Sequence, residues 1–146
     1  MTMRTGGLSV PTDLRSAVVG TIDVSHDRLF SRVLRVSAWG CVVLIAVLSL
    51  LPAEDMVRTP LGGHVEHMTA YAGTAALLRL SYPRQGKRIA VAMSMYAGLL
   101  ELLQNLAPGR HPAVADWFFS SAGALLGIVL IHVTCQVWWR RRAGQA

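Results

Sequence analysis

The sequence is short of charged residues, and this shortage excludes most soluble proteins. Only 15% of its 146 residues are Asp, Glu, Lys or Arg, whereas 53% are hydrophobic. Soluble domains usually carry about a quarter charged residues. A chain of this length has room for one domain, and one soluble domain cannot hide so much apolar surface. The composition therefore predicts an integral membrane protein.

Cysteine is also scarce. Cys41 and Cys135 are the only two cysteines, and both lie inside apolar runs. A zinc–cysteine cluster or a disulfide framework needs more ligands or more pairs than this, so we expect buried small hydrophobic side chains at both positions. The sequence also lacks a P-loop, a GxGxxG and a GxSxG motif. A nucleotide-driven pump or a serine hydrolase therefore has no support.

Apolar residues instead gather in four runs, each close to the roughly 20 residues that cross about 30 Å of hydrocarbon. The second run is the shortest and most polar. Proline and glycine residues break the chain between the runs. The predicted spans cover about residues 33–51, 64–80, 89–106 and 114–139.

These spans predict an all-α fold, a four-transmembrane-helix bundle with a short cytoplasmic N-terminal tail. Residues 1–32 lack sustained periodicity and are interpreted as that tail, with an interfacial helix near 24–35. The transmembrane domain is then 33–139, and 140–146 form a basic cytoplasmic tail.

The basic residues set the predicted orientation. All Lys and Arg residues except Arg58 and Arg110 lie in or beside the N-terminal tail, the loop at 79–88 and the C-terminus. Because cytoplasmic loops are enriched in Lys and Arg, we expect both termini in the cytoplasm and the loops at 53–63 and 107–113 outside. Short basic clusters between apolar runs are not a continuous phosphate-binding face, so no nucleic-acid partner is expected.

Polar residues concentrate near the predicted outer ends of the helices. At 1.5 Å per residue, the polar positions of the second, third and fourth spans fall within roughly 10 Å of the outer surface. Ionisable groups inside a membrane are costly and commonly functional. The candidate binding residues are His67, Tyr71, Glu101, Gln104, Arg110 and Asp116.

Two interpretations of this cluster stay open. The polar residues could form an outward-facing pocket that binds a polar head group or performs acid–base chemistry. Alternatively, Arg110 could pair with Glu101 or Asp116 in a closed structural network, and Asp116 could simply cap the helix that it begins.

A metal site has weak support. His64 and His67 are three residues apart and could begin such a site with Glu101 or Asp116. However, their segment reads HVEH rather than the HExxH zinc motif, and no further ligand is fixed by spacing. We therefore predict no metal and no cofactor.

Gly123 and Gly127 form a small-xxx-small pair in the fourth span. Small residues at this spacing let two helices approach closely. We expect the pair to serve packing within the bundle.

Together these motifs resemble the VanZ-like membrane proteins. The resemblance covers about residues 36–135. It rests on the order and spacing of matching positions: His67, Tyr71, Glu101, Gln104, Pro108, Gly109, Arg110, Asp116, Gly123 and Gly127. Ser120 stands where the family commonly has Asn, and the Lys or Arg often found before the His is absent.

The resemblance implies a multi-pass protein of the bacterial cytoplasmic (inner) membrane, in a family named for a protein linked to glycopeptide (teicoplanin) resistance. The predicted function is binding of an envelope or lipid-linked component, with membrane lipids and an envelope component or membrane protein as partners. Catalytic residues are not identified. The alternatives are a membrane enzyme acting on a lipid-linked or cell-wall substrate, with His67 or Glu101 as base, and a ligand-free accessory subunit of a membrane complex.

Overall fold

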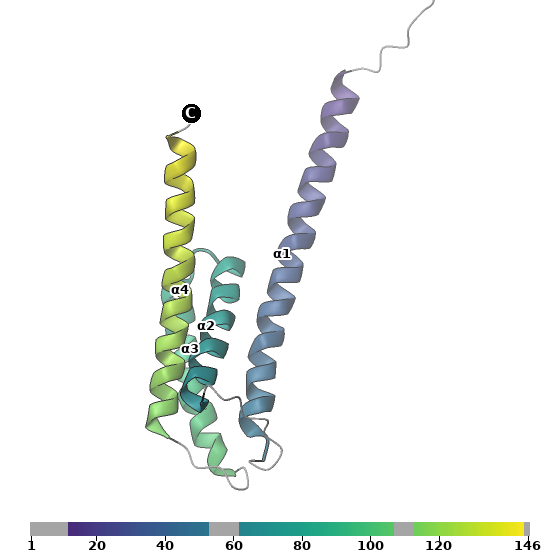
Figure 1. The fold of residues 1–146 in the computed structure, drawn as a ribbon. Helices are drawn as coiled ribbons and strands as arrows, with labels where there is room; N and C mark the ends of the chain where they lie inside the picture. The colour runs from purple at the N-terminus through teal and green to yellow at the C-terminus, as the bar shows by residue number, and fades with distance from the viewer. Residues whose placement is uncertain (1–11, 53–61, 107–112, 145–146) are drawn as a thin grey trace, which may run out of the picture. The chain divides into compact units, whose positions relative to one another are not determined.

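The computed structural model describes residues 12–52, 62–106 and 113–144, and over these residues the chain is helical without strands. Its four long helices are α1 (Thr12–Leu50), α2 (Gly63–Ser81), α3 (Gly86–Leu103) and α4 (Val114–Ala143). A short 3₁₀ helix, η2 (Gln104–Leu106), directly continues α3 (Figure 1). The all-α class is confirmed.

The first helix is longer than the sequence predicts. α1 begins at Thr12 and runs without interruption to Leu50, so residues 12–32 are helical rather than part of an irregular tail, and 24–35 are not a separate helix. The physical reason is the absence of breakers: no proline lies between Pro11 and Pro52, and proline is the residue that stops a helix.

Glycine and proline also define the ends of α2. Gly62, which precedes the helix, has φ +84°, a conformation that glycine adopts without steric cost. After the helix ends at Ser81, the Arg79 guanidinium donates a hydrogen bond to the carbonyl oxygen of Pro83. This contact satisfies a backbone acceptor in the turn before α3.

Three helical segments are long and apolar enough to cross a membrane: Arg28–Leu50, Gly86–Leu106 and Val114–Ala143. The 19-residue α2 does not meet the same criterion. It carries His64, Glu66, His67 and Arg79, and these lower its hydropathy. The described chain is therefore a helical protein with three segments suited to a bilayer.

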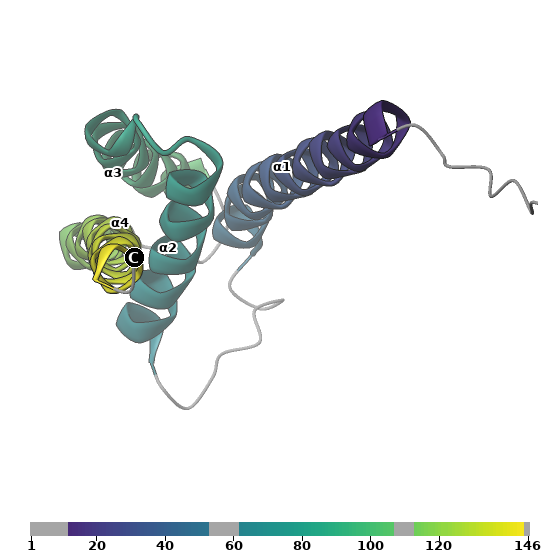
Figure 2. The ribbon, with the colours of Figure 1, turned by 90° about the horizontal axis from the view of Figure 1, so that it is seen from above.

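The chain divides into two compact units, one up to Val33 and one from Leu34. Within the second unit, α2 packs along α4, and α3 packs against both; Figure 2 shows the three helices from one end. The tightest approach lies at Gly123 and Gly127. A Cβ at Gly123 would overlap the Met68 carbonyl group, and one at Gly127 would overlap that of Ala72. The predicted packing role of the two glycines is confirmed.

Within the second unit, the C-terminal part of α1 joins this core through both polar and apolar contacts. The Tyr96 hydroxyl of α3 donates to the Val42 carbonyl oxygen at 2.6 Å. The Trp39 indole N–H donates to the Tyr82 hydroxyl at 3.2 Å. Ala38 and Ile45 of α1 lie in the same buried apolar cluster as Ala75, Met93 and Ala124.

Large apolar side chains remain exposed along α1, α3 and α4. Examples are Val36, Met95, Leu102 and Leu130. Cys135 is exposed as well, whereas Cys41 is half-buried. Such extensive apolar exposure is unusual for a protein in water and suits helices that face lipid.

Candidate functional site

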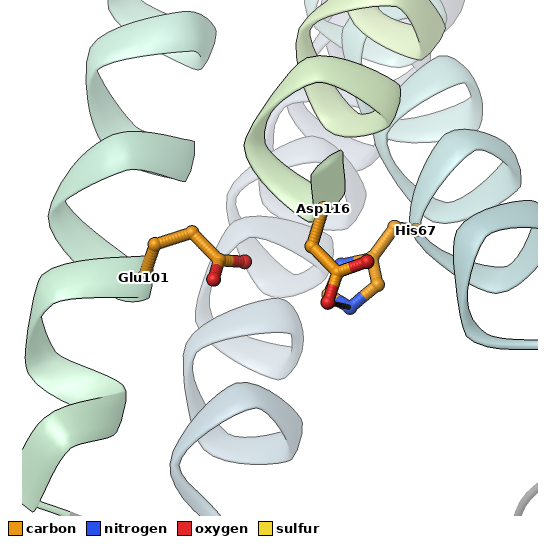
Figure 3. Close-up of side chains that lie close together, drawn as sticks. All are labelled: His67, Glu101 and Asp116. Atoms are coloured by element: carbon orange, nitrogen blue, oxygen red, sulfur yellow. Dashed lines mark ion pairs between the residues drawn. The ribbon is translucent and has the colours of Figure 1, made fainter. Parts of the chain in front are cut away.

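Three of the predicted binding residues meet at one end of the bundle. His67 lies in the second turn of α2, Glu101 in the last turn of α3 and Asp116 in the first turn of α4. One ring nitrogen of His67 and one oxygen from each carboxylate lie within 4.8 Å of one another. Figure 3 shows the three side chains pointing toward one another from three helices. We call this group the carboxylate–histidine cluster.

Asp116 holds the two histidines of α2 to the start of α4. Its Oδ1 accepts a hydrogen bond of 2.8 Å from His64 Nδ1. Its Oδ2 lies 3.9 Å from His67 Nε2. The His64 ring stacks on Phe119 at 4.6 Å between centroids. The His64 side chain is 55% exposed and that of Asp116 only 23%, so His64 is the more accessible of the two partners.

Asp116 does not cap its helix. The capping position of α4 is Ala113, which makes no side-chain capping bond. Asp116 sits three residues further on, within the first turn, where a negative charge is stabilised by the helix dipole. The sequence-based alternative of a simple cap is therefore wrong.

Glu101 is the most buried member of the cluster, at 8% exposure. Its Oε2 accepts a hydrogen bond of 3.1 Å from the backbone N–H of Ala113. The carboxylate thus connects the end of α3 with the residue before α4. Burial of an ionised carboxylate is costly unless the carboxylate is well partnered. The hydrogen bond from the Ala113 N–H offsets part of that cost.

Ser120 contacts His67, which in turn lies beside Asp116. The same three residue types form the catalytic triad of many hydrolases. The Ser120 Oγ lies 3.5 Å from His67 Nδ1, on the ring edge away from Asp116. However, Ser120 is only 1% exposed, between α2 and α4. In this structure the hydroxyl is therefore a buried contact of His67 and is not presented to solvent as a nucleophile.

The other predicted residues differ in their placement. Tyr71 is buried one turn after His67, with its ring 6.4 Å from that of Tyr96. Gln104 is buried in η2, three residues after Glu101. Arg110 lies outside the described residues.

Sequence reasoning left His64 out of the binding residues and missed the contacts of Ser120 and of the Ala113 backbone. The i,i+3 spacing of His64 and His67 was a usable signal, because such residues share a helix face. No sequence signal points to a backbone N–H as the partner of Glu101. Comparisons with protein-family models, curated proteins and solved structures give no match for the chain.

Proposed function

We propose that the chain is a VanZ-like integral membrane protein of the bacterial cell envelope, which binds an envelope or lipid-linked component through a polar site at the outer face of the cytoplasmic membrane. One observation carries the proposal: His67, Glu101 and Asp116 converge from three helices to within 4.8 Å. These residues are also part of the motif that resembles the family. Polar groups gathered at this depth are costly in lipid, which favours a functional role.

The proposal includes a fourth span, α2, and a cytoplasmic location for both termini. At 19 residues, α2 is about 28 Å long, close to the thickness of the hydrocarbon core. Its polar residues face α4 at His64 and His67, and its close packing on Gly123 and Gly127 suits a helix inside a bundle. The bias of Lys and Arg supports the orientation.

The chemistry of the site favours a ligand rich in hydrogen-bond donors. Two carboxylates accept hydrogen bonds from hydroxyl, amide or ammonium groups. Sugar and peptide parts of envelope precursors carry such donors. The exposed His64 and the partly exposed Asp116 are the first groups that such a ligand would meet. In this proposal Arg110 contributes the positive charge that holds an anionic group of the ligand.

The experiment compares Glu101→Ala and Asp116→Ala with the wild-type protein in a strain that lacks the gene. We expect both variants to lose complementation of teicoplanin susceptibility, at membrane levels equal to wild type. His132→Ala is the matched control, because His132 lies 16 positions beyond Asp116 on α4 and bonds Gln136 instead. Full complementation by both acidic-site variants would overturn the proposal.

A second candidate function is a membrane enzyme acting on the same class of substrate. It is favoured by the buried Glu101 carboxylate beside His67, since a carboxylate and an imidazole can share general acid and base roles. Turnover of envelope lipids by purified protein, lost in Glu101→Gln, would select this candidate. Co-purification of a membrane protein partner that is insensitive to all site variants would instead select a ligand-free accessory subunit.

A further inference from the structure

The carboxylate–histidine cluster has the composition of a metal site. It offers one imidazole nitrogen and two carboxylate oxygens, and these come from α2, α3 and α4. Three protein ligands of this kind are found where a divalent metal keeps a further position for water or substrate. The sequence did not predict a metal site, because ligands on three helices leave no spacing motif.

The distance between His67 and Asp116 is informative. His67 Nε2 and Asp116 Oδ2 lie 3.9 Å apart, which is too far for a direct hydrogen bond. Two ligand atoms that bind one Zn²⁺ ion at about 2.1 Å each lie roughly 3–4 Å apart. The observed separation is within the range expected for two ligands of a common ion. All three ligand atoms lie within 4.8 Å of one another, so side-chain movements of at most about an ångström bring them to the same bond lengths.

Each potential ligand is held by a second partner. The Ser120 hydroxyl engages His67 Nδ1, on the ring edge away from Asp116. His64 donates to Oδ1 of Asp116, and the Ala113 N–H donates to Oε2 of Glu101. Metal-binding histidines and carboxylates commonly have such outer partners, which fix the tautomer and orientation of each ligand.

Charge favours a cation at the same place. Two carboxylates in one cluster repel each other, and burial increases the cost of their ionised forms. A divalent ion between Glu101 and Asp116 would offset both charges. A nitrogen ligand combined with oxygen ligands favours Zn²⁺ or a similar transition metal over Mg²⁺ or Ca²⁺, which prefer oxygen alone.

We propose that His67, Glu101 and Asp116 bind a divalent transition-metal ion, with Zn²⁺ as the best candidate, and that His64 and Ser120 position two of the ligands. Metal binding goes beyond the proposed function, because it requires no envelope component and is measurable without one. An ion with three protein ligands also has room for an oxygen atom of water or of a bound molecule.

The test uses the purified full-length protein in detergent micelles, with any polyhistidine tag removed. Zn²⁺ binding is measured by titration calorimetry, and the bound metal by elemental analysis after dialysis. We expect one ion per chain. His67→Ala, Glu101→Gln and Asp116→Asn should each weaken the affinity by at least about tenfold, whereas His132→Ala should leave it unchanged. Equal affinity in all four variants, or no saturable binding by the wild-type protein, would overturn the proposal.

Replacement of a buried residue can also prevent folding, so the wild-type protein receives a second measurement. Co²⁺ is bound in place of Zn²⁺, and the visible absorption of the complex is compared with that of free Co²⁺. A new spectrum of low-symmetry Co²⁺ with nitrogen and oxygen ligands, displaced by one equivalent of Zn²⁺, is the expected result. A Co²⁺ spectrum identical to that of the free ion would contradict the site even if every variant failed to fold.

Failure of the metal site and failure of the proposed function are separable. A protein that binds Zn²⁺ but whose Glu101→Ala and Asp116→Ala variants complement the deletion strain would retain the metal site and lose the proposed function. A protein that binds no Zn²⁺, but whose variants fail to complement, would retain the function and lose the metal site.

Discussion

The carboxylate of Glu101 accepts a hydrogen bond of 3.1 Å from the backbone N–H of Ala113. This contact links the last turn of α3 to the residue that precedes α4. Glu101 therefore has a structural role in addition to any role in binding. The two roles depend on different properties of the side chain, because the hydrogen bond needs only an oxygen acceptor, whereas ligand or metal binding uses the negative charge.

The first prediction separates these roles with two variants of Glu101. Glu101→Gln retains an acceptor for the Ala113 N–H, so its thermal midpoint should stay close to wild type. Glu101→Ala removes the acceptor and leaves the N–H unpaired, which should cost about 1–3 kcal/mol. The measurement is thermal unfolding in detergent, followed by circular dichroism. A Gln variant as unstable as the Ala variant would show that the charge itself is needed for folding.

The second prediction concerns the contact between α2 and α4. Gly123→Ala and Gly127→Ala each place a Cβ against backbone atoms, 2.9 Å from the Met68 Cα and 3.1 Å from the Ala72 Cα, respectively. Backbone cannot move aside as a flexible side chain can, so we expect a loss of about 1–3 kcal/mol for each substitution, read from the thermal midpoint.

Gly73→Ala is the matched control for these two substitutions. Gly73 lies on α2, and a Cβ there would meet nothing within 4 Å. Alanine favours a helix over glycine by about 1 kcal/mol, so this variant should be as stable as wild type or more stable. Similar destabilisation at all three glycines would contradict the close approach of α2 and α4.

The helices could largely be predicted from the sequence, because apolar runs and proline breakers are local features. The small-xxx-small spacing of Gly123 and Gly127 also predicted a close helix contact, and the contact lies inside the bundle. The beginning of α1 was not predictable in the same way. Its first part is polar, and this polarity predicts irregular structure. However, no proline lies between Pro11 and Pro52, so nothing there stops a helix.

Three members of the site could be predicted from the sequence, whereas the contacts between them could not. Depth along the helices placed His67, Glu101 and Asp116 near one end of the bundle, which agrees with their convergence. Depth cannot give the rotation of each helix about its axis, which decides that Asp116 faces both histidines of α2. It also cannot identify a backbone donor such as the Ala113 N–H, since every residue except proline carries one.

The third prediction concerns Ser120, which acts on the site through His67. Its hydroxyl lies 3.5 Å from His67 Nδ1, a long and therefore weak hydrogen bond. Ser120→Ala should change stability by no more than about 1 kcal/mol. If the metal proposal holds, the same variant should lower Zn²⁺ affinity by about tenfold, as loss of an outer partner does. Unchanged affinity would show that packing alone fixes the imidazole. Ser121→Ala is the control, because Ser121 bonds Ser94 instead.

The last prediction tests whether α2 crosses the membrane. Single cysteines are placed by Asp55→Cys, Gln85→Cys and Ala146→Cys in a Cys41→Ala, Cys135→Ala background, and intact cells are treated with a membrane-impermeant maleimide. If four helices span the bilayer, both termini lie on the same side, which the proposal places in the cytoplasm. Only the cysteine at 55 is then outside and should react. If only the three apolar segments span it, α2 stays outside. Residue 85 and the C-terminus then lie outside as well. The cysteines at 85 and 146 should then react as well. Reaction at all three positions would therefore refute the four-span topology, and permeabilised cells provide the control that each cysteine can be labelled.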